Sequence, residues 1–181
     1  MTDQVRPHST PAKVAHWGFI VVFVYALTKQ LDEVEELEDL ALLQYEMIFA
    51  TVFLLLLVTR FVYMQFTRPT VLPSTTPASQ RLMARAVHIG MYSCLAGVAV
   101  TGLIVGGLYG SGTKSGGAME ILLVLHEVCI NTCYLLIALH IAAAIYHRRQ
   151  ADGIWDAMVP FWQEQRQDSE QGVRNQIDSE S

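Results

Sequence analysis

The chain has 181 residues, of which 52% are hydrophobic and only 16% are charged, and its formal net charge is -5. Because soluble domains contain about 25% charged residues, this composition excludes an ordinary soluble domain and predicts an integral membrane protein of one domain. No nucleic-acid partner is expected. The three cysteines, Cys94, Cys129 and Cys133, lie in apolar stretches, which predicts packing roles rather than a disulfide framework or a zinc site.

The chain begins with a polar tail at residues 1–12, which we expect to be flexible. The first apolar run, residues 13–28, lacks a cleavage motif after it and is expected to remain as a membrane anchor. His16 and Trp17 stand at its start. Trp is typical of a membrane interface, and His16 is either an axial ligand or an interfacial polar residue. The acidic connection that follows, residues 29–40, is expected to form a short surface helix.

The second span covers residues 41–64 and carries a charged residue near each end. Glu46 is either an interfacial carboxylate or a proton-handling group near a cofactor. Arg60 either extends to the membrane surface or pairs with an anionic group of a cofactor. A proline-containing linker leads to the third span, residues 81–109, which contains His88 and small residues that permit close helix approach.

The fourth span, residues 119–149, is long enough to cross a bilayer and carries His126 and His140 within its apolar run. Their separation of 14 residues is nearly four helical turns, so both imidazoles lie on one face, about 21 Å apart along the axis. Such histidines either bond across the bundle or have a functional role. The two on one face, at different depths, favour redox centres at two levels. A polar tail at residues 150–181, with an interfacial segment at 154–162, ends the chain.

These elements predict an all-α, integral membrane four-helix bundle at residues 13–149, between two tails. With four spans both termini lie on one side, which carries ten of the twelve Lys and Arg residues if Arg60 is counted there. This distribution predicts a multi-pass membrane protein with both termini in the cytoplasm. His16 and His140 then share the cytoplasmic depth, where two neutral imidazoles suit a low-spin b-type haem. His88 shares this depth and is too far from His126 to be its partner.

Four segments carry a resemblance to a known family: AHWGF, LLVTRF, AVHIGMY and LHEV…YLLIALHIAAAIYH, which contain His16, Arg60, His88 and the fourth-span histidines. In these segments and in the order of its elements, the chain resembles the bacterial cytochrome b561 family, small four-helix membrane cytochromes. The resemblance implies that His16 and His140 hold an inner haem b. Arg60 and Arg85 are then candidates for contacts with the haem propionates on the cytoplasmic side.

The family holds its outer haem between the fourth helix, where His126 matches, and a histidine of the second helix. In this chain that second-helix position is Glu46. One haem is therefore expected at the inner site, and three alternatives remain for the outer site. His126 is paired with Met47 or Glu46, a five-coordinate haem stays open to a small molecule, or the site is empty.

The resemblance implies electron transfer through haem, often between a quinone and another redox partner. Superoxide oxidase activity, which some members have, is not expected, because the acidic outer loop would repel superoxide. That acidic face instead suits a basic redox protein, such as a c-type cytochrome, or a sister subunit. Two other hypotheses remain: a non-redox membrane anchor with degraded haem sites, and an ion or proton carrier that uses Glu46 and the histidines.

Overall fold

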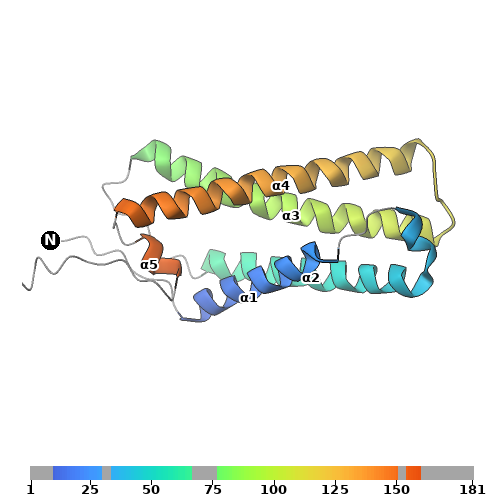
Figure 1. Ribbon diagram of the computed structural model, residues 1–181, viewed down its shortest axis with the longest axis horizontal. Coiled ribbons are helices and arrows are strands. Elements are labelled where there is room, and N and C mark those ends of the chain that lie inside the picture. Colours follow the sequence, from blue (N-terminus) through green and yellow to red (C-terminus); the bar gives the residue numbers. More distant parts are fainter. Residues whose placement is uncertain (1–9, 30–33, 67–76, 151–153, 160–181) are drawn as a thin grey trace, which may run out of the picture.

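The computed structural model describes residues 10–29, 34–66, 77–150 and 154–159, and the regular structure within these residues is entirely helical. A 3-10 turn precedes the second long helix and a short helix follows the fourth (Figure 1). The elements in chain order are α1 (Thr10–Leu27), η1 (Val34–Glu38), α2 (Leu40–Phe66), α3 (Ala78–Gly110), α4 (Gly117–Gln150) and α5 (Ile154–Met158).

Within the described residues, α1, α2, α3 and α4 are each long and apolar enough to cross a membrane. They have 18, 27, 33 and 34 residues, against the roughly 20 that a bilayer requires. Many large apolar side chains are exposed along them, for example Leu55 at 62% and Leu135 at 60%. The fold is therefore an all-α membrane four-helix bundle whose outer surface is apolar, as the sequence predicts.

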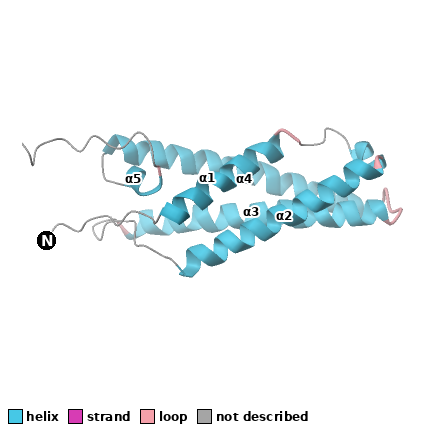
Figure 2. Ribbon diagram, turned by 90° about the horizontal axis from the view of Figure 1, so that it is seen from below, coloured by secondary structure: helices cyan, strands magenta, loops and turns pink. Residues whose placement is uncertain are grey.

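The four long helices lie side by side along the long axis of the molecule (Figures 1 and 2). Helix α3 packs along both α2 and α4, and α1 packs on α2. At one end of the bundle lies α5, and at the other lies η1. We call the half of the bundle nearer to α5 the α5 half and the other half the η1 half.

Glycines of α3 allow α4 to approach closely. An ideal Cβ built at Gly90 would lie 2.9 Å from Leu136 Cδ1, and one at Gly97 would lie 2.8 Å from Cys129 Sγ. Any side chain at these positions would press on α4, so the predicted role of small residues in close helix approach is confirmed at this interface.

Aromatic rings join α1 to α2. Phe19 packs on Phe53 with ring centroids 5.1 Å apart, and Tyr25 packs on Phe49 at 5.8 Å. The Tyr25 and Tyr45 hydroxyls are 2.6 Å apart in the η1 half. These contacts fix the position of α1, and therefore of the His16 that it carries.

Two apolar clusters fill the bundle. The first, centred on Phe19, Phe53, Leu57, Leu95, Ala99 and Cys133, joins all four long helices. The second lies in the η1 half and contains Leu37, Leu43, Val105, Tyr109 and Met119. All three cysteines are free, which confirms that they form no disulfide.

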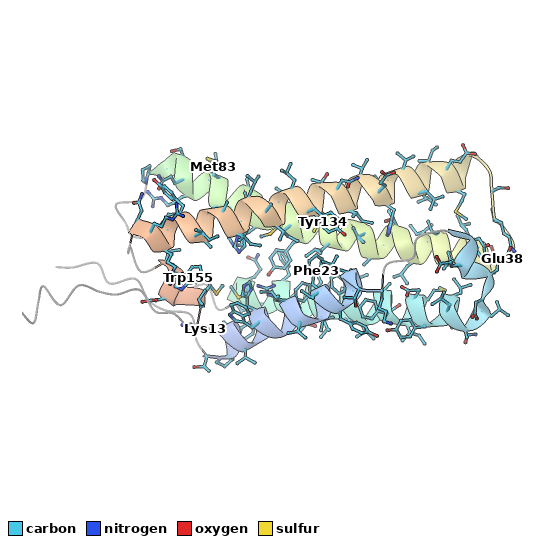
Figure 3. The ribbon with its side chains drawn as sticks, viewed as in Figure 1. Lys13, Phe23, Glu38, Met83, Tyr134 and Trp155 are labelled. Atoms are coloured by element: carbon cyan, nitrogen blue, oxygen red, sulfur yellow. The ribbon has the colours of Figure 1, made fainter. Side chains whose placement is uncertain are left out.

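Helix α5 is attached to the start of α1 and the end of α4. Lys13 Nζ donates a hydrogen bond to the Asp156 carbonyl at 2.7 Å, and Trp17 Nε1 donates one to the Met158 carbonyl at 3.3 Å. The Arg148 guanidinium lies 5.0 Å from the centre of the Trp155 ring. Figure 3 shows Lys13 and Trp155 at this end and Glu38 at the opposite end. Of the predicted interfacial segment, residues 160–162 lie outside the described residues, as do most of both tails.

Candidate functional site

Each long helix contributes one imidazole or guanidinium group to a cluster in the α5 half. Arg60 of α2 donates a hydrogen bond from Nη2 to Nδ1 of His16 of α1, at 2.6 Å. The Arg60 guanidinium also interacts electrostatically with His140 of α4. The His140 ring meets the His88 ring of α3 edge to face, with centroids 5.0 Å apart and planes at 81°. The structure therefore places two contacting pairs in the α5 half: His16 with Arg60, and His88 with His140.

The positive charge of Arg60 is only partly exposed inside the bundle. Its guanidinium lies 5.3 Å from the centre of the Phe19 ring and 5.8 Å from that of Tyr92. Within the described part of the chain, Arg60 forms no ion pair with a carboxylate. Lys114 and Glu38 do form an ion pair, but they lie in the η1 half. Because a cation inside a membrane span is costly without a counter-ion, this cluster fits an anionic group such as a haem propionate.

The hydrogen bonds identify the available lone pairs of two imidazoles. A guanidinium only donates, so His16 Nδ1 accepts from Arg60 and uses the single lone pair of a neutral ring. Coordination through Nε2 would require the ring proton on Nδ1, and Arg60 could then no longer donate to that nitrogen. His88 Nδ1 lies 2.6 Å from the Ala84 carbonyl, which only accepts. His88 therefore carries its proton on Nδ1 and keeps a lone pair on Nε2.

These residues fit a b-type haem in the α5 half. Two imidazoles from different helices can supply axial ligands, and Arg60 can neutralise a propionate. Among the described residues no group of three or more His, Cys, Asp or Glu side chains could hold a bare metal ion. A haem needs only two such axial ligands from the protein, because the porphyrin supplies the others.

In the η1 half, His126 of α4 lies against α3. Its Nδ1 is 2.8 Å from the Thr101 Oγ1, and the same hydroxyl lies 2.6 Å from the Gly97 carbonyl. The ring also fits over a glycine, since an ideal Cβ at Gly102 would lie 3.3 Å from His126 Cε1. A polar hydroxyl and a missing side chain on α3 therefore fix the position of this imidazole.

Met47 and Glu46 of α2 both lie in the η1 half, but their side chains leave the helix in different directions. The Met47 side chain packs on α3, where an ideal Cβ at Gly106 would lie 3.1 Å from its Cγ and 3.6 Å from its Sδ. Leu43, one turn earlier, contacts the same glycine. Glu46 is half-buried and lies about 100° from Met47 around the helix axis. Gly102 and Gly106 thus face two different helices.

The remaining predicted residue, Arg85, is exposed on α3 three residues before His88. Sequence analysis assigned no role to Thr101 and did not identify the contact between His88 and His140. Thr101 could have been noticed as a hydroxyl in an apolar run, because such side chains often bond between membrane helices. His88 was placed at the right depth, but its direction depends on how α3 is rotated against α4.

Comparison with known proteins agrees with this arrangement. The profile of the family described as prokaryotic cytochrome b561 matches residues 7–161, which include every candidate residue described above. No curated protein and no solved structure gives a match.

Proposed function

Because the chain belongs to the prokaryotic cytochrome b561 family, whose members are membrane b-type cytochromes of electron transfer, we propose that it carries electrons through a haem b bound by His16 and His140. The observation that carries this proposal is the cluster in the α5 half, to which all four helices contribute. We propose that residues 13–149 form the haem-binding unit, between two tails.

Each residue of the cluster has a distinct task. His16 and His140 offer imidazole lone pairs from opposite sides, which suits a low-spin centre with no open position. Arg60 would pair with a propionate of the haem in place of its hydrogen bond to His16, and the exposed Arg85 is a second, weaker candidate for such a contact. His88 packs on the His140 ring and restricts its rotation. When bound, the haem supplies a one-electron Fe(III)/Fe(II) couple.

The α5 half is proposed to face the cytoplasm of a bacterial inner membrane, because most Lys and Arg residues gather on that side. A membrane quinone is the proposed redox partner that reaches the haem from within the bilayer. At the opposite end, the exposed Glu36, Glu38 and Asp39 suit a basic redox protein or a sister subunit.

Replacing His140 tests the proposal. The His140→Ala variant should lose the low-spin haem of the α5 half, which visible difference spectra and a haem count per chain would detect. His147→Ala is the matched control, since it removes another imidazole of α4 and should retain this haem. A His140→Ala protein with an unchanged low-spin spectrum would contradict the assignment.

The alternative of a non-redox membrane anchor rests on one observation, the Glu46 that stands where the family has a histidine. It predicts a stable, colourless protein whose four helices fold without haem. The same haem count therefore separates the two hypotheses.

A further inference from the structure

We propose that the η1 half binds a second haem through His126 alone and leaves the opposite axial position open to a small neutral ligand such as carbon monoxide. This inference rests on the proposed function, because it assumes a protein that binds haem b. It selects one of the three alternatives that the sequence left open. The protonation of His126, the position of Met47 and the chemistry of Glu46 support it.

The hydrogen bonds fix the protonation state of His126. Thr101 has one hydroxyl proton, and the 2.6 Å contact with the Gly97 carbonyl requires it, since a carbonyl cannot donate. Thr101 Oγ1 must therefore accept the hydrogen bond from His126, whose Nδ1 carries the proton. The lone pair is left on Nε2. An imidazole that donates through one nitrogen and coordinates through the other is the usual arrangement of a metal-ligating histidine.

Helix α3 gives this ring no freedom to turn away. Gly102 lies under the ring, and its missing side chain lets His126 Cε1 approach to 3.3 Å from the ideal Cβ position. His126 is half-buried, so its ring is held between helices and does not extend into the lipid. The hydroxyl of Thr101 and the missing side chain of Gly102 together hold the ring in one orientation.

Met47 is engaged elsewhere and is not the second ligand. Its side chain packs with the apolar cluster of the η1 half and lies on Gly106. The face of α2 that carries Met47 is the same face that carries the buried Leu43. To coordinate a haem bound by His126, the thioether would have to leave this cluster, at a cost of apolar contacts.

Glu46 occupies the remaining position, and it offers a carboxyl group. Its position matches that of His126 in one respect: Glu46 precedes Arg60 by 14 residues, as His126 precedes His140. The two pairs therefore lie at similar separations on helices that run in the same direction, from the η1 half to the α5 half (Figure 1). A carboxylate is a hard oxygen ligand, whereas low-spin haem is held by His, Met or Cys. Glu46 therefore adjoins the haem site without closing the axial position.

The test is the reaction of the purified, reduced full-length protein with carbon monoxide, followed by visible difference spectroscopy with a haem count per chain. The wild-type protein should contain two haems, of which half bind carbon monoxide. Glu46→His restores an imidazole and should convert the reactive haem to a low-spin, unreactive one. Glu46→Gln removes the charge at nearly the same size and should keep the reaction.

His126→Ala provides a second arm if Glu46→His does not fold, since it should remove only the reactive haem. Two low-spin haems that ignore carbon monoxide would overturn the inference, and so would a single low-spin haem. Both of these results leave the proposed function intact. A protein with only the reactive haem would instead refute the role of His16 and His140, and a colourless protein would refute both.

Discussion

The α5 half and the η1 half use the same helix, α4, to present a histidine, but the other helices meet these histidines differently. In the α5 half, α1 contributes an imidazole and α2 contributes a cation, both within contact distance of each other. In the η1 half, α3 supplies a hydroxyl and a glycine to His126, while α2 supplies a carboxyl group and a methionine that packs elsewhere. One scaffold thus gives the two histidines of α4 different surroundings.

We infer that haem ligation and helix packing are separate properties of this fold. The α2–α3 contacts come from Leu43, Met47 and their neighbours, and Glu46 lies on another face of α2. The side chain at position 46 can therefore change without loss of these contacts. The largest expected effects on the two sites are the loss of a haem in His140→Ala and the change of haem ligation in Glu46→His.

Removal of the Arg60 charge should act on the α5 half alone. Arg60→Leu takes away a cation that favours the reduced haem, so the midpoint potential of the low-spin haem should fall by about 60 mV, a tenfold change in a one-electron equilibrium. A redox titration monitored in the visible region measures this shift. Arg149→Leu is the matched control, because Arg149 is exposed in the last turn of α4 and lies outside the cluster. An equal shift in both variants would refute the special role of Arg60.

The sequence predicted the four spans and the depth of each histidine along its helix, because the length and periodicity of an apolar run do not depend on how the helices pack. It did not predict which group each histidine meets. The Arg60–His16 and Thr101–His126 hydrogen bonds depend on the rotation of two helices about their axes. The helix ends also differ by a few residues: α3 begins at Ala78, directly after Pro77, and α1 begins at Thr10.

A change at Thr101 should act on the η1 half alone. Thr101→Val keeps the shape of the side chain but removes the acceptor for His126, and loss of such a partner typically weakens metal binding about 10- to 100-fold. The rate at which each haem transfers to added apomyoglobin would measure this effect, with the haem that binds carbon monoxide and the low-spin haem followed separately. Thr101→Ser keeps the hydroxyl and should behave like the wild type. Faster loss of the low-spin haem instead would show that the two halves are coupled.

The smallest effect is expected at the rim of the η1 half, where Lys114 pairs with Glu38 at 2.9 Å. The hydrogen bond to Glu38 raises the pKa of Lys114 above its usual value. A raised pKa in the folded state stabilises the protein below the unfolded-state pKa, about 10.4, and this contribution disappears as the pH rises through the folded value. Lys114→Gln should therefore unfold at nearly the wild-type temperature at pH 7, since both side chains are more than half exposed. Any small difference should vanish in strongly alkaline solution, and a large difference at pH 7 would contradict this interpretation.

The most direct test of the central claim is an oxidised-minus-reduced visible spectrum of the purified protein, combined with a pyridine haemochrome count and an electron paramagnetic resonance spectrum of the ferric state. The account predicts b-type haem in two equal populations, one low-spin and one high-spin, with the low-spin signal lost in His140→Ala and the high-spin signal lost in His126→Ala. A stable protein without haem would contradict the account and leave the membrane anchor as the better explanation.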